Sequence, residues 1–263
     1  MRRNNSEYMA TYKKRGHKPK TQAEKKSAIE EQSTTAEVFN TLDEGASKTE
    51  EWVIKNQKYI FIIVGVVAAV VLGYLGYNKF IQEPKESEAM NDMFQAQQYF
   101  DQAVNAVEKD SLFKLSLDGG EGKYGMLDII NNHKGTKAGN LANYYAGMAY
   151  LNTKDYQNAI SYLSDFKSGD DALGPIAKGA IGDAFVQLNQ PSDALDYYVK
   201  AAQLKTNDFT TPMYLYKAGV IALQLEDNAQ ALKYFNRIKD EFPDSSEATN
   251  IDVFIGKAQA ASN

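Results

Sequence analysis

The chain has 263 residues, which is enough for one domain of ordinary size together with an anchor and a tail. It contains no cysteine, so disulfides, thiolate metal sites, a cysteine nucleophile and a lipoprotein anchor are excluded. The net charge of −5 is unevenly distributed: residues 1–58 carry twelve Lys/Arg and nine Asp/Glu, whereas residues 59–263 carry seventeen and twenty-five. This acidic later part argues against binding of a nucleic-acid backbone there.

The N-terminal segment is polar. Residues 1–35 are rich in Lys, Glu, Gln, Ser and Thr, so we expect residues 1–58 to form a basic, cytosolic and largely disordered tail. Its Lys/Arg cluster could bind anionic lipid or the ribosome, or could act only as an orientation signal. Met9 offers a second translation start, so initiation at Met1 or at Met9 stays open.

The most apolar stretch is Ile60–Tyr77, which contains no charge and is bounded by Lys58 and Lys79. As a helix it would be roughly 27 Å long, close to the thickness of a bilayer's hydrocarbon core. A cleaved signal peptide has only a short basic leader, but many residues precede this stretch. The sequence therefore predicts a transmembrane helix over residues 59–80.

The Lys/Arg bias around this stretch predicts its orientation. The first 26 residues hold nine Lys/Arg and two acids, whereas Lys79 and Lys85 follow the apolar stretch among several acids. By the positive-inside rule, the N-terminus is cytosolic and the C-terminal part lies outside. Within the helix, small residues recur every four positions at Gly65, Ala69 and Gly73. They could let another helix pack closely, or they could simply reflect the abundance of Gly and Ala in membrane helices.

Three later stretches resemble one another: residues 144–163, 179–198 and 216–235, with periods of 35 and 37 residues. A glycine, then an alanine twelve residues on, then a bulky residue four further recur in each. These are Gly147, Ala159 and Leu163; Gly182, Ala194 and Tyr198; and Gly219, Ala231 and Phe235. The small residues mark where the two helices of a hairpin cross, and the bulky residue fills the remaining gap.

This pattern resembles the tetratricopeptide repeat, and it predicts an all-α fold: a single transmembrane helix followed by a short α-solenoid of tetratricopeptide-type helical hairpins. Since one hairpin cannot bury its own apolar face, at least three must stack. We place the domain in residues 81–263. Its expected parts are repeats at about 140–173, 175–208 and 212–245, a degenerate pair at 87–133 with a loop at 110–123, and a capping helix at 247–260.

The residues that catalysis would need are scarce. His133 is the only histidine outside the tail, and the sequence contains no nucleophile elbow, zinc-binding helix or phosphate-binding loop. We therefore predict no enzyme activity and no catalytic, cofactor or metal site.

The resemblance implies a protein-binding groove lined by the first helix of each repeat. The implied lining residues are Leu141, Tyr144, Met148, Leu151, Asn152, Ile176, Gly179, Asp183, Val186, Gln187, Met213, Tyr216, Val220, Leu223 and Gln224. Alternatively, some of them pack against the terminal helix. The carboxylate-clamp form of such grooves needs basic and Asn side chains, but Tyr144 and Met148 occupy two of those places; Lys217 matches one position.

The whole layout resembles the YfgM-like ancillary subunits of the bacterial Sec translocon, in the version found in Bacteroidota. The segments that carry this resemblance are KGTKAGNLANYYAGMAYL and DYQNAISYL. It implies a non-enzymatic scaffold in the bacterial inner membrane, with a periplasmic repeat domain that associates with the SecYEG channel and binds chaperones or emerging secretory proteins. Alternatives are a scaffold of the same build for envelope assembly or cell division, an enzyme of unknown type, and a protein whose repeats lie in the cytoplasm.

Overall fold

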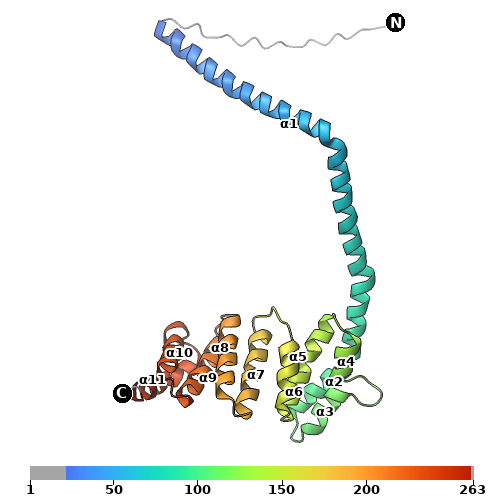
Figure 1. Cartoon of the computed structure of the whole chain (residues 1–263), viewed down its shortest axis with the longest axis vertical. Helices are drawn as coiled ribbons and strands as arrows, with labels where there is room; N and C mark the ends of the chain where they lie inside the picture. Colours follow the sequence, from blue (N-terminus) through green and yellow to red (C-terminus); the bar gives the residue numbers. More distant parts are fainter. Residues whose placement is uncertain (1–21, 262–263) are drawn as a thin grey trace, which may run out of the picture. The chain divides into compact units, whose positions relative to one another are not determined.

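The computed structural model describes the backbone of residues 22–261 and the side chains of residues 49–261. Within these residues the chain is helical apart from its connections (Figure 1). It divides into two compact units, with the boundary between Tyr74 and Leu75. The basic cluster of the first twenty residues and the two alternative start sites lie outside the described residues.

The first unit contains most of helix α1 (Gln22–Tyr77). The apolar side chains of residues 61–75 in this helix are exposed: Phe61 is 73% exposed and Leu72 is 68% exposed. Because no described side chain of the protein covers them, water is an unfavourable solvent for this surface. Among the described residues, one helix is long and apolar enough to cross a membrane, which is compatible with a single-pass anchor.

Helix α1 starts much earlier than the sequence analysis suggested. It begins at Gln22, inside the segment that was expected to be largely disordered. Residues 22–58 contain no proline and a single glycine, Gly45, while Ala, Glu and Lys are common. Low hydrophobicity predicts that a segment cannot form a hydrophobic core of its own, but such a segment can still form an isolated helix.

The second unit begins with the last three residues of α1. These are followed by a π-helical turn (Asn78–Gln82), α2 (Glu83–Asn105), α3 (Asp110–Asp118) and α4 (Met126–Asn132). The predicted loop at 110–123 was wrong, because its first nine residues form α3. Phe113 and Leu117 of this helix are buried against α2 and α5. Gly119, at φ +81°, ends the helix, so the loop starts only there. The expected degenerate pair is thus three helices.

Three helical hairpins follow. The first helices are α5 (Lys137–Asn152), α7 (Leu173–Gln187) and α9 (Thr210–Gln224); the second helices are α6 (Tyr156–Asp165), α8 (Pro191–Leu204) and α10 (Asn228–Glu241). Side chains and a proline at the hairpin turns set the helix starts: Asp155 and Asp227 accept hydrogen bonds from backbone N–H groups of α6 and α10, and Pro191 is the first residue of α8.

The repeating glycines lie at the helix crossings. A Cβ added to Gly147 would lie 2.5 Å from Leu163, and one added to Gly219 would lie 2.3 Å from the ring of Phe235. The partner in each case lies sixteen residues later in the second helix of the same hairpin. The spacing of small and bulky residues in the sequence therefore corresponds to direct contacts, and the α-solenoid of helical hairpins is confirmed.

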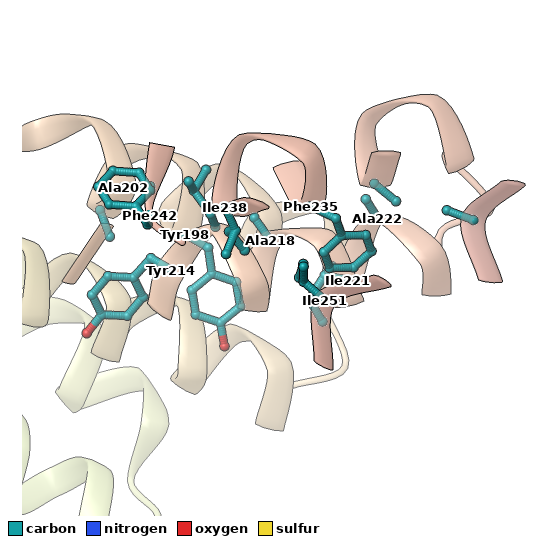
Figure 2. Close-up of a cluster of buried hydrophobic side chains, with 14 of the residues drawn as sticks. Tyr198, Ala202, Tyr214, Ala218, Ile221, Ala222, Phe235, Ile238, Phe242 and Ile251 are labelled. Atoms are coloured by element: carbon teal, nitrogen blue, oxygen red, sulfur yellow. The ribbon is translucent and has the colours of Figure 1, made fainter. Parts of the chain in front are cut away.

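The stack ends with a 3-10 turn (Ser246–Asn250) and α11 (Ile251–Ala260). Ile251 and Ile255 of α11 are buried in a cluster with α8, α9 and α10, part of which is shown in Figure 2. The helix thus covers the apolar face that the last hairpin would otherwise expose to water.

Candidate functional site

The first helices of the three hairpins form one continuous face, which we call the inner face. Helix α5 contacts α7, and α7 contacts α9, whereas the second helices α6, α8 and α10 have at most marginal contact with one another. The first helices are therefore closer together, and the stack curves with α5, α7 and α9 on its inner side.

A tyrosine fills the floor of the inner face between α7 and α9. Gly179 of α7 is buried, and a Cβ built on it would lie 1.9 Å from Cε1 of Tyr214. The Tyr214 ring, only 3% exposed, stacks against that of Tyr198 with centroids 6.3 Å apart, and Figure 2 shows the two rings side by side. Gly179 therefore does not line an open groove, contrary to what its repeat position implied.

A polar trio joins three helices at this point. Oδ1 of Asp183 (α7) accepts a hydrogen bond of 2.6 Å from the Tyr198 hydroxyl (α8) and one of 2.7 Å from Nζ of Lys217 (α9). The Lys217 ammonium also lies 5.5 Å from the ring centroid of Tyr198 and 5.7 Å from that of Tyr214. Ion pair and cation–π contacts thus hold Lys217 in one place.

The electrostatics of the two tyrosines follow from this packing. Burial raises the pKa of Tyr198 far above its usual value, and the hydrogen bond to the Asp183 carboxylate raises it further. Burial likewise raises the pKa of Tyr214, with smaller contributions from the charge of Asp183 and from Tyr144. Both hydroxyls therefore stay protonated at physiological pH, and that of Tyr198 acts as a hydrogen-bond donor.

The predicted groove residues with side-chain amides differ in how free those amides are to bind another molecule. Asn152 donates its side-chain N–H to the carbonyl of Met148 in its own helix at 2.8 Å, so that donor is occupied. Gln187 is exposed and accepts a long hydrogen bond of 3.4 Å from the Tyr156 hydroxyl. Gln224 is exposed as well.

The predicted apolar residues are partly covered. Leu141, Tyr144 and Met148 of α5 are half-buried, and Tyr144 packs against Phe166 with ring centroids 5.3 Å apart. At the far end, Tyr216 packs edge-on against Phe254 of α11 at 5.0 Å. The α11 end of the inner face is therefore partly covered by the chain itself.

Few charges lie on the inner helices. Helices α5, α7 and α9 carry only Lys137, Lys178, Asp183 and Lys217. Lys178 lies 5.8 Å from the ring centroid of Tyr197, and Lys217 is paired with Asp183. The acidic excess of the second unit thus lies elsewhere, and the inner face is a nearly uncharged aromatic and amide surface with one ion pair near its centre.

His133 is engaged outside this face. Its Nε2 lies 2.8 Å from Oδ2 of Asp92, and its imidazole is 12% exposed. The pair joins the end of α4 to α2. Among side chains 49–261, no group of three His, Cys, Asp or Glu could hold a metal ion.

Sequence reasoning missed the roles of Tyr198 and Tyr214 on the inner face. A glycine at position 179, where the other two repeats have Tyr144 and Tyr216, is a signal that could have found Tyr214. Such a gap must be filled by a bulky side chain from the next hairpin, because interiors are closely packed.

Comparison with known proteins bears on this architecture. Residues 141–168 and 180–246 each match a family model described as tetratricopeptide repeat. No curated protein matches the chain significantly. The chain therefore carries tetratricopeptide repeats, which indicate a scaffold for protein–protein interaction.

Proposed function

We propose that this protein is a non-enzymatic, membrane-anchored scaffold whose inner face binds protein segments on the outer side of a bacterial inner membrane. Two features support the anchor and its direction: the uncharged helical stretch Ile60–Tyr77 and the Lys/Arg excess that precedes it. On this proposal the second unit is periplasmic and the N-terminal segment is cytosolic.

The observation that carries the binding role is the surface of α5, α7 and α9. It combines half-exposed aromatic and Met side chains with exposed amides and has almost no charge. Such side chains give adaptable contacts to protein segments of varied sequence. The proposed contact residues are Leu141, Tyr144, Met148, Asn152, Asp183, Gln187, Met213, Tyr216 and Gln224.

For the partner, we propose the SecYEG translocon together with periplasmic chaperones or secretory proteins that emerge from it. The support is the resemblance of the layout: a cytosolic N-terminus, one membrane helix and a repeat domain outside. A repeat surface of low specificity suits clients that arrive unfolded and differ in sequence.

Site-specific crosslinking tests this proposal. A photoreactive amino acid is placed at Gln187 on the inner face or, as a control, at Lys233 on the outer helix α10, and crosslinking is performed in intact cells. Products that contain SecY, a periplasmic chaperone or an exported precursor from position 187 but not from position 233 support the proposal. Products that contain only division or envelope-assembly proteins would replace the translocon with the alternative scaffold role.

Orientation needs a separate test. Alkaline phosphatase fused after residue 263 is active only outside the cytoplasm, so an active fusion supports a periplasmic repeat domain. An inactive fusion that is present in full length would place the repeats in the cytoplasm and overturn the proposed location.

A further inference from the structure

We infer that Asp183 and Lys217 together bind the backbone N–H and C=O groups of one residue in an extended, internal polypeptide segment, and that the inner face does not select a C-terminal carboxylate. This inference rests on the proposed role of the inner face in binding protein. It specifies which part of the bound protein is recognised at the centre of that face.

The inference is based on the hydrogen-bonding groups of Asp183 and Lys217 that are not used within the chain. Both internal donors, Tyr198 and Lys217, use the same oxygen of Asp183, Oδ1. Within residues 49–261, Oδ2 accepts no hydrogen bond, and Lys217 donates none apart from the one to Asp183. An ammonium has three N–H donors, so two are left. The pair therefore offers one acceptor and free donors side by side.

Both groups are accessible and already held in position. The side chains of Asp183 and Lys217 are 38% and 35% exposed, so a ligand can reach them. The Tyr198 hydroxyl fixes the carboxylate, and two tyrosine rings flank the ammonium. Because contacts within the chain already hold both side chains, they lose little conformational entropy when they bind a peptide.

The charge balance selects the class of ligand. A carboxylate would gain from Lys217 but be repelled by Asp183, and a Lys or Arg side chain would meet the reverse situation. A neutral donor and a neutral acceptor that point the same way can use both groups without repulsion. The N–H and C=O groups of one residue in an extended backbone are such a pair. Exposed Gln187 and Gln224 offer the same neutral chemistry elsewhere on the face.

The packing of Tyr214 at the floor of the inner face also supports recognition of the backbone. Tyr214 occupies the space above Gly179, next to the pair, so no hollow is left there for a large side chain. A segment that lies across this point is held by polar contacts to its backbone, and sequence preference has to arise at other positions. This arrangement fits the binding of segments with different sequences.

The test uses full-length protein in detergent micelles and short synthetic peptides with amidated C-termini that tile an unfolded exported polypeptide. The tightest binder is then resynthesised with a free C-terminal carboxylate and, separately, with single N-methyl groups that remove one backbone N–H at a time. We expect the free carboxylate to give no tighter binding and one N-methyl position to weaken binding by about tenfold.

Variants of Asp183 and Lys217 then test whether these two residues account for the weaker binding of the N-methylated peptide. In Asp183→Ala and in Lys217→Met, the amidated peptide should bind about tenfold more weakly, and the N-methyl group should cause no additional loss. Asp196→Ala and Lys200→Met remove a matched ion pair on the outer helix α8 and should bind like the wild type. If Asp183→Ala perturbs the tyrosine near-ultraviolet circular dichroism, Asp183→Asn replaces it, since it keeps the size and one oxygen.

The outcomes separate the two proposals. If no peptide binds to the wild type, the proposed function of the inner face fails, and this inference fails with it. If peptides bind but the N-methyl loss is the same in the Asp183 and Lys217 variants, only the inference is overturned. Tenfold tighter binding of the free-carboxylate peptide also overturns the inference and leaves the binding role intact.

Discussion

The anchor helix and the repeat hairpins use glycine in opposite ways. A Cβ added to Gly65 or Gly73 in the first unit would have nothing within 4 Å, whereas one added to Gly182 in the second would lie 2.7 Å from the Tyr198 ring. In the repeats, the space above each such glycine is already occupied by another side chain of the same chain. At Gly65 and Gly73 of α1 no described side chain of the chain lies within 4 Å of such a Cβ, so the space is open to a packing partner.

Large apolar residues show the same contrast. Phe235 in α10 is completely buried, whereas Phe61 in α1 is 73% exposed. The repeats derive stability from such a residue within the chain, whereas the described part of α1 does not. The difference teaches that apolar content alone does not identify what a helix packs against; the partner at the correct spacing does.

The largest effect that tests this contrast is the loss of the Phe235 ring. We expect Phe235→Ala to lower the free energy of unfolding of the repeat domain by about 3–5 kcal/mol, because the ring is buried among Gly219, Tyr216 and Phe254 and the cavity cannot refill. Thermal unfolding of the full chain in detergent, followed by tyrosine near-ultraviolet circular dichroism, measures it. Phe61→Ala is the control and should leave the transition unchanged; equal losses in both variants would contradict the contrast.

Much of this contrast could be predicted from sequence. The period of 35 and 37 residues and the spacing from Gly219 to Phe235 identified the helix crossings, because close packing at a crossing needs a small residue opposite a bulky one. The expected loop at 110–123 missed helix α3, because its glycines lie only after residue 118 and do not affect the residues before them. The start of α1 at Gln22 was missed because a helix without a core leaves no periodic apolar signal.

The candidate site was less predictable than the fold. Repeat register proposed Asp183 as a groove residue and matched Lys217 to one position of the carboxylate clamp. It could not show that Tyr198 and Lys217 both donate to the same oxygen of Asp183. Such contacts depend on the rotation of α7 against α8 and α9, which a sequence pattern does not encode. The position of Tyr214 over Gly179 likewise became evident only from the three-dimensional packing.

A smaller effect should follow from adding a single methyl group at a helix crossing. We expect Gly219→Ala to destabilise the repeat domain by about 1–3 kcal/mol, because the added Cβ would overlap the buried Phe235 ring and this overpacking outweighs the gain in helix propensity. The same near-ultraviolet melts measure it. Gly73→Ala, made in the open part of α1, should leave the transition in place, and a loss of similar size there would show that its space is not open.

Alkaline pH should destabilise the repeat domain through its buried tyrosines. The pKa values of Tyr198 and Tyr214 are raised above their unfolded value of about 10, so both stay protonated in the folded state while the unfolded chain loses these protons. The stabilisation that follows from these raised pKa values is therefore fully present below pH 10. Above pH 10 the free energy of unfolding decreases by about 1.4 kcal/mol per pH unit for each tyrosine.

Unfolding free energies between pH 9 and 12, together with tyrosinate absorbance, check this alkaline loss. Tyr198→Phe removes one titrating group, so its stability should decrease less steeply than that of the wild type. A variant with the same slope as the wild type would mean that the Tyr198 hydroxyl ionises in the folded state.

The smallest expected effect concerns the hairpin turns, which have no counterpart among the described residues of the first unit. Each turn contains one residue with positive φ: Lys154 at 66°, Asn189 at 56° and Glu226 at 62°. A Cβ is unfavourable in this conformation, and Asn tolerates it better than Glu. Glu226→Gly should therefore raise the unfolding free energy by about 0.5 kcal/mol, after the entropy gained by the unfolded chain is subtracted. Asn189→Gly in the equivalent turn should stabilise the domain less or not at all. The difference between the thermal unfolding midpoints of the two variants therefore measures the strain at Glu226. If Asn189→Gly stabilised the domain more than Glu226→Gly, backbone strain would not be what distinguishes the two turns.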